Sequence, residues 1–116
     1  MLFELLRLMG YDATVFISPH EALDATERRS FDAIVCDYHM PVMNGREFYQ
    51  QVAARRPELA RRMVFLTGDM SDDGTLEFLE SNANQHLFKP FQMVELQNVL
   101  NHCLAHDFGR VIANAA

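Results

Sequence analysis

Residues 31–45 read FDAIVCDYHMPVMNG, and this stretch decides the fold. The run Phe31–Cys36 is almost entirely apolar, which is typical of a parallel strand covered by helices on both faces. An acidic residue, Asp37, follows the run directly. Asn44 is a good helix N-cap, so a helix is expected to begin after it. The stretch therefore predicts a buried strand, a loop that opens with a carboxylate, and a helix.

The same alternation of apolar runs and amphipathic stretches extends in both directions along the chain. Strands that alternate with helices imply right-handed crossovers and a parallel sheet with helices on both faces, a doubly wound α/β fold. Residues 108–116 show no clear pattern and are expected to be a C-terminal tail after a domain at 1–107. The expected strands are 13–17, 31–36, 63–66 and 86–88, and the expected helices begin near Leu2, Ser18, Asn44, Ser71 and Met93.

Size and composition narrow the class of protein. A chain of 116 residues is one domain, and its net charge of −6 argues weakly against a nucleic-acid surface. No apolar stretch approaches the ~20 residues of a membrane span, and the first residues do not read as a signal peptide. The two cysteines, Cys36 and Cys103, read as small buried hydrophobes of a reducing compartment. A cytoplasmic protein without a membrane partner is expected.

Three polar residues stand where strands are predicted to end. Asp37, Thr67 and Lys89 each follow an apolar run, and Lys89 is the only lysine in the chain. Ligands of such sheets bind outside the carboxyl ends of the strands. A carboxylate, a hydroxyl and an ammonium on one rim would suit a transferred phosphoryl group, as nucleophile or metal ligand, hydrogen-bond donor and counter-charge. Each residue alone is better explained as a polar strand end at the solvent boundary, so only the combination of the three, in this order, carries the prediction.

The chain resembles the receiver domain of bacterial response regulators and hybrid histidine kinases, from about Met1 to His106. The most specific segment is 31–45, with its aspartate, Met-Pro pair and glycine. The segments 66–69 (LTGD) and 88–91 (FKPF) are similar to the family's hydroxyl-bearing loop and lysine-proline motif. The resemblance implies a flavodoxin-like sheet with strand order 2-1-3-4-5.

The resemblance also implies a role for each residue. Asp37 would accept a phosphoryl group from a phosphohistidine on a histidine kinase or histidine phosphotransfer domain, giving 4-aspartylphosphate. Mg²⁺ would be held by the Asp37 carboxylate, the backbone carbonyl of His39 and an acidic pair from the first strand's loop. Thr67 would donate a hydrogen bond to the phosphoryl group and Lys89 would pair with it. Such a domain is a signalling module rather than an enzyme.

Two further residues take roles from the resemblance. The bond between Lys89 and Pro90 is expected to be cis, a form open to X–Pro bonds at small cost. His86 occupies the place of a rotating aromatic switch, although a surface imidazole at a strand end is an equally good interpretation.

One part of the family pattern is absent from the start of the chain. A receiver begins with an apolar strand and two adjacent acidic residues, whereas Met1 falls inside the first helix and Glu4 lies on that helix. The absent strand would stand between 13–17 and 31–36, so an unpaired gap is expected there. The chain could start at an internal methionine, be a fragment of a longer polypeptide, or be a reduced receiver that pairs with another chain or a second copy.

Several functions are therefore compared. The leading hypothesis is a phosphoacceptor in a two-component phosphorelay. The alternative is a pseudo-receiver that binds proteins without being phosphorylated, which the absent acidic pair favours. A hydrolase of the aspartyl-phosphate type would carry a second acid at position 39, where this chain has His39. Flavin binding is disfavoured because the strand-end loops carry no phosphate cradle.

Overall fold

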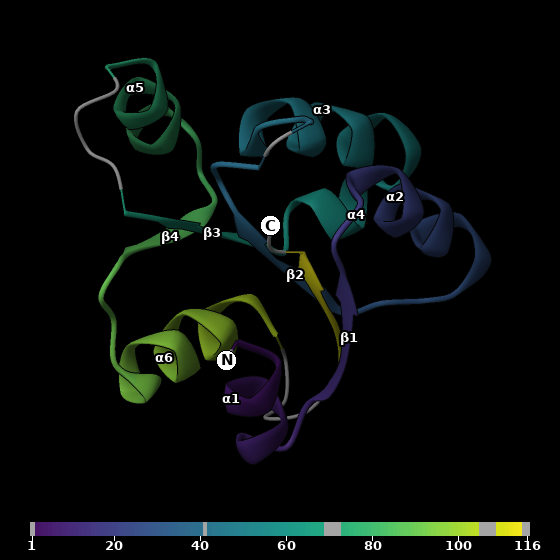
Figure 1. Ribbon diagram of the computed structural model, residues 1–116, viewed down its shortest axis with the longest axis vertical. Helices are drawn as coiled ribbons and strands as arrows, with labels where there is room; N and C mark the ends of the chain where they lie inside the picture. Colours follow the sequence, from purple (N-terminus) through teal and green to yellow (C-terminus); the bar gives the residue numbers. More distant parts are fainter. Residues whose placement is uncertain (1, 41, 69–72, 105–108, 115–116) are drawn as a thin grey trace.

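Among the residues that the structure describes, five strands form one parallel sheet in the order β1-β5-β2-β3-β4 (Figure 1). This computed structural model describes residues 2–40, 42–68, 73–104 and 109–114. The strands are β1 (Asp12–Phe16), β2 (Ala33–Asp37), β3 (Met63–Thr67), β4 (Gln85–Phe88) and β5 (Arg110–Asn114). The helices are α1 (Leu2–Leu8), α2 (Pro19–Arg28), α3 (Gly45–Arg55), α4 (Pro57–Ala60), α5 (Asp73–Ser81) and α6 (Met93–Cys103). The doubly wound α/β fold predicted from the sequence is confirmed.

Two expectations about the sheet were wrong, and β5 corrects both. The segment 108–116 was assigned to a tail without a pattern, but Arg110–Asn114 forms a strand. That strand lies between β1 and β2 and pairs in parallel with both, so the expected gap is filled. If β5 preceded α1 in the chain, the sheet order would be 2-1-3-4-5. The C-terminal segment thus occupies the place of the family's first strand.

The side chains of the central strands alternate between the two faces of the sheet. On β5, Val111 and Ala113 belong to the apolar cluster that includes residues of α1 and α6, while Ile112 belongs to the cluster on the other face, which includes residues of α2, α3, α4 and α5. The same alternation holds along β2, because successive residues of a strand point to opposite faces. Figure 1 shows α1 and α6 on one side and α2, α3, α4 and α5 on the other. Two apolar layers therefore meet at β5, and Val111 and Ile112 are fully buried.

Local signals placed most helix ends correctly. Asn44 caps α3 and forms a capping box with Glu47, whose amide N–H donates to Asn44 Oδ1 at 2.9 Å. The Ser18 hydroxyl accepts a hydrogen bond from the Glu21 amide at the start of α2. Gly10, which was expected to end the first helix, has a φ of +95° that favours glycine. The short helix α4 was not expected, and Ser71, expected to open α5, lies outside the described residues. Within the described part of the chain, no helix is long and apolar enough to cross a membrane.

A glycine at the start of α3 allows that helix to approach β2 and β3 closely. A Cβ on Gly45 would lie 2.8 Å from Cδ2 and 3.1 Å from Cα of Tyr38, which is buried. We expect Gly45→Ala to lower the free energy of unfolding by about 1–3 kcal/mol because the packed core must shift. Gly68→Ala is the control, since a Cβ there would meet Lys89 only at 3.7 Å. Urea unfolding of both variants measures the difference, and equal midpoints would contradict this expectation.

Candidate functional site

The carboxyl ends of β2, β3 and β4 bring the three predicted residues to one edge of the sheet. Asp37 ends β2 and pairs with Leu66, Thr67 ends β3 and pairs with Phe88, and Lys89 follows β4 directly. These pairings follow from the parallel register of three neighbouring strands. A carboxylate, a hydroxyl and an ammonium, each borne by a different strand end, therefore share this edge.

The strongest contact of the site joins Asp37 to Lys89. Lys89 Nζ donates to Asp37 Oδ2 at 2.7 Å, a charge-assisted hydrogen bond. The Asp37 side chain is only 15% exposed, whereas that of Lys89 is 43% exposed, so the lysine reaches the carboxylate from the solvent side. The second carboxylate oxygen, Oδ1, accepts a hydrogen bond from the His39 amide at 3.3 Å. Both oxygens of Asp37 are thus oriented by donors.

The backbone around Lys89 fixes where its ammonium can reach. The Lys89 amide donates to the Thr67 carbonyl at 2.8 Å, which extends the β3–β4 pairing beyond the end of β4. The Lys89–Pro90 peptide bond is cis, as the resemblance implied. Thr67 itself is fully buried at the end of β3. The lysine backbone is therefore held against the strand that carries the hydroxyl.

His86 lies on β4, and β3 separates this strand from β2, which ends in Asp37. It pairs with Phe65 of β3, and its imidazole is half-buried. The ring makes an edge-to-face contact with Phe88 at 5.3 Å between centroids. The expected switch residue therefore lies on the strand that leads into Lys89. The strand pairing places it beside Phe65 and not beside Asp37.

A thiol next to Asp37 is chemically quiet. Cys36 is fully buried on β2, and its Sγ donates to the Asp37 carbonyl at 3.3 Å. Burial, and secondarily the negative charge of Asp37, raise the pKa of this thiol above its ordinary value. A protonated, buried thiol is a poor nucleophile. Of these two neighbouring side chains, the buried Cys36 thiol is therefore not available for nucleophilic chemistry, and the Asp37 carboxylate is the partly exposed group at the end of β2.

The described residues do not supply the magnesium ligands that the resemblance implied. Nowhere in the described part of the chain do three or more His, Cys, Asp or Glu side chains gather as a metal cluster. The strand that takes the place of the family's first strand ends at Asn114, and the sequence continues Ala115-Ala116 rather than with two acids. The Asp37 carboxylate alone, already paired with Lys89, does not make a three-carboxylate site. The described residues therefore do not fit the magnesium site that the resemblance implied.

Comparison with known proteins identifies the family of the chain. The family model described as "Response regulator receiver domain" matches residues 1–101. This chain belongs to the response regulator receiver domain family. Receivers are in general signalling domains rather than enzymes, and the matched residues include all three strand-end positions of the site. The match ends before β5, which is the strand that the family model does not reach.

Relatives of this receiver are parts of much longer regulators. The transcriptional regulatory protein ZraR of Salmonella typhimurium is 31% identical over 102 residues, which are 88% of this chain and 23% of that protein. The two-component response regulator ORR21 of Oryza sativa is 31% identical over 100 residues, 84% of this chain and 14% of that protein. The chain thus spans about a quarter or less of the length of these curated relatives.

Solved receivers share the fold of this chain. The receiver domain of the sensor histidine kinase PA1611 from Pseudomonas aeruginosa has a TM-score of 0.76 and 28% identity, covering 90% of this chain and 86% of that one. That structure is described with a magnesium ion coordinated in the active-site cleft. The Vibrio cholerae chemotaxis protein CheY4 has a TM-score of 0.75 and 30% identity, covering 90% of this chain and 87% of that one.

The sequence did not predict that β5 borders the site, on the side of β2 opposite to β3. Asn114 of β5 pairs with Cys36 of β2 and with Phe16 of β1, immediately beside the position of Asp37. The signal was present but short, since Val111-Ile112-Ala113 is an apolar, β-branched run that follows a glycine and an arginine. Three residues are below the length at which a strand is distinguished from a tail.

Proposed function

We propose that this receiver is the phosphoacceptor of a two-component phosphorelay and that Asp37 takes the phosphoryl group. The observation that carries the proposal is the 2.7 Å contact between Lys89 Nζ and Asp37 Oδ2 at the carboxyl edge of the sheet. The Asp37 carboxylate, whose side chain is 15% exposed, would be the nucleophile, and the Lys89 ammonium, which approaches it from the solvent side, would be the counter-charge. The two groups already lie in contact before a phosphoryl group arrives.

The chemistry can be written with the residues of this chain. A carboxylate oxygen of Asp37 attacks the phosphorus of a phosphohistidine on a histidine kinase or histidine phosphotransfer domain. The new P–O bond forms as the P–N bond breaks, and the electron pair returns to the partner's imidazole, which takes a proton from water. Lys89 moves its ammonium from the carboxylate to a phosphoryl oxygen, where it neutralises charge. Thr67, at the neighbouring strand end, donates its hydroxyl hydrogen to another phosphoryl oxygen.

A switch residue and a cellular setting belong to the same proposal. His86, which is half-buried and whose ring contacts Phe88, turns this ring when the Thr67 hydroxyl moves toward the phosphoryl group. Such a turn changes the face formed by α5, β4 and α6, where an output partner or a second copy would bind. The domain acts in the cytoplasm, does not itself bind nucleic acid, and includes β5 as part of its sheet.

The test is phosphorylation of the purified chain with acetyl phosphate. We expect a mass gain of one phosphoryl group that is absent in Asp37→Asn, because the amide is not a nucleophile. Parallel samples with Mg²⁺ and with a chelator measure how far Lys89 suffices as the positive charge. Glu58→Gln, on the exposed surface of α4, is the control for loss of a carboxylate. Absence of any mass gain in both conditions would contradict the proposal.

One observation favours a second function, a pseudo-receiver that binds proteins without phosphorylation. The end of β5 offers Asn114 and then alanines in place of an acidic pair, so the family's metal ligands are not supplied there. The acetyl phosphate experiment separates the two functions, since only the phosphoacceptor gains mass at Asp37.

A further inference from the structure

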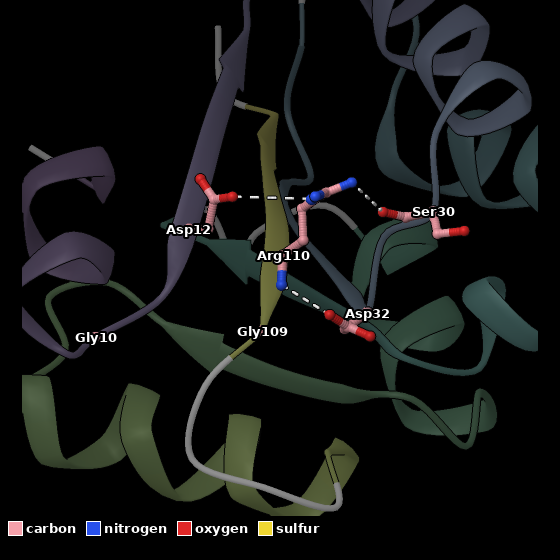
Figure 2. Close-up of a pocket in the computed structure, with 6 residues that line it drawn as sticks. All are labelled: Gly10, Asp12, Ser30, Asp32, Gly109 and Arg110. Carbon is pink, nitrogen blue, oxygen red and sulfur yellow. Dashed lines mark hydrogen bonds and ion pairs between the residues drawn. The ribbon is translucent and has the colours of Figure 1, made fainter.

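The amino edge of the sheet, opposite to Asp37, holds β5 in a specific way. A pocket at this edge is lined by Gly10, Asp12, Ser30, Asp32, Gly109 and Arg110 (Figure 2). Figure 2 shows Arg110 at its centre, between Asp12 of β1 and Asp32 at the entry to β2. The pocket therefore lies where β5 begins, between β1 and β2.

Asp32 binds the backbone of β5 from two directions. Its carboxylate Oδ2 accepts the Arg110 amide hydrogen at 2.7 Å, and its own amide donates to the Arg110 carbonyl at 2.7 Å. The Asp32 carboxylate thus accepts a backbone hydrogen bond from β5 in addition to those of the regular strand pairing. On the other side, the Asp12 amide donates to the Gly109 carbonyl at 2.9 Å.

The space beside the Asp32 carboxylate favours glycine at position 109, directly before Arg110. A Cβ on Gly109 would lie 2.9 Å from Asp32 Oδ2 and 3.2 Å from its Cγ, so a side chain there would displace the carboxylate. By contrast, the arginine side chain makes only long contacts: Nε lies 3.8 Å from Asp12 Oδ2, and the guanidinium donates to the Ser30 carbonyl at 3.4 Å. The side chains of Arg110 and Asp12 are 47% and 75% exposed. The contact between Asp32 and the Gly-Arg backbone, rather than the surface ion pair, specifies the position of β5.

The register set at this edge reaches the phosphoacceptor edge along the same strands. With Arg110 held by Asp32, Val111 lies opposite Ala33, and Asn114 lies opposite Cys36, the residue before Asp37. A slip of one residue would send every β5 side chain to the opposite face of the sheet. Asp32 precedes β2 and Asp37 ends it, and β5 pairs with one side of this strand while β3 pairs with the other.

We propose that Asp32 is a positioning residue that locks the register of β5 and thereby builds the rim beside Asp37. The coupling to phosphorylation rests on the function proposed above, whereas the lock itself does not. Loss of the Asp32 acceptor leaves the Arg110 amide without its partner, so β5 loosens first and the end of β2 follows.

Backbone hydrogen exchange of the full chain, followed by NMR, tests the lock. In Asp32→Ala we expect exchange of the Val111–Ala113 amides to accelerate about tenfold or more relative to the Val64–Leu66 amides of β3. Asp32→Asn keeps an acceptor oxygen and should retain most of the protection. Asp12→Ala removes only the exposed ion pair and is the matched control. Equal acceleration in β5 and β3, or none in either, would overturn the lock.

The amide signals of His39 and Lys89 test the coupling without phosphorylation. The chemical shifts of these two amides should change in Asp32→Ala and remain those of the wild type in Asp32→Asn and Asp12→Ala. The rate of acetyl phosphate labelling should fall about tenfold in Asp32→Ala alone. A loosened β5 with unchanged rim signals and labelling would overturn the coupling. If the wild-type chain is not labelled, the proposed function fails, and the exchange and rim signals still decide this inference.

Discussion

Replacing Ile112 by aspartate is expected to unfold the protein. Ile112 is fully buried on β5, where it packs with the helices that cover one face of the sheet. The substitution removes a large apolar side chain from the core and places a carboxylate there without a cation to pair with it. The combined cost is about 5 kcal/mol or more, comparable to the whole stability of many small domains.

An isoleucine on the surface provides the matched control. Ile17, just after β1, is 77% exposed, so Ile17→Asp should change the free energy of unfolding by no more than about 0.5 kcal/mol. Circular dichroism and urea unfolding of the two variants are the measurements. A cooperatively folded Ile112→Asp chain with near wild-type stability would show that β5 is not part of the core in solution.

Removing the ammonium of Lys89 is expected to slow phosphorylation of Asp37 by about a hundredfold, the usual effect of deleting one charge-stabilising donor. In Lys89→Ala the negative charges of the carboxylate and of the incoming phosphoryl group meet without the cation that lies 2.7 Å from Asp37 Oδ2. The lysine side chain is 43% exposed, so the fold should be little affected. The rate of labelling by acetyl phosphate measures the effect.

Two further variants show whether the geometry or only the charge of Lys89 matters. Lys89→Arg keeps the charge on a planar group of different reach and should recover only part of the rate. Arg61→Ala removes a positive charge from an exposed position after α4 and should label like the wild type. Equal rates in Lys89→Ala and Arg61→Ala would exclude a role of the ammonium in the transfer.

The sequence alone was sufficient for the parts of the fold that local patterns determine. Phe31–Cys36 was predicted as a buried strand because it is an unbroken apolar run, and α3 was predicted from Asn44 and the apolar positions behind it. The strand ends Asp37 and Lys89 were predicted to meet because parallel strands share one edge, and the structure places them in contact.

The parts that were missed depend on contacts between distant segments. The local signal in Val111-Ile112-Ala113 is too short to distinguish a tail from a central strand, and the partners of this segment are more than seventy positions away in the sequence. Its burial between two strands, and the fit of Gly109 against Asp32, exist only in three dimensions. The expected gap was wrong because it assumed that the central strand must come from the start of the chain.

The direction of β5 has a practical consequence for any polypeptide joined to this domain. The strand runs parallel to β1 and β2, so its carboxyl end points to the same edge of the sheet as Asp37. A tag, reporter or fusion partner attached after this strand would therefore emerge over the edge of the sheet that carries Asp37 and obstruct an approaching protein. A fusion partner attached before α1 would leave the carboxyl end of β5 free. Comparing the phosphorylation rates of the two fusions would distinguish steric hindrance from a loss of reactivity at Asp37.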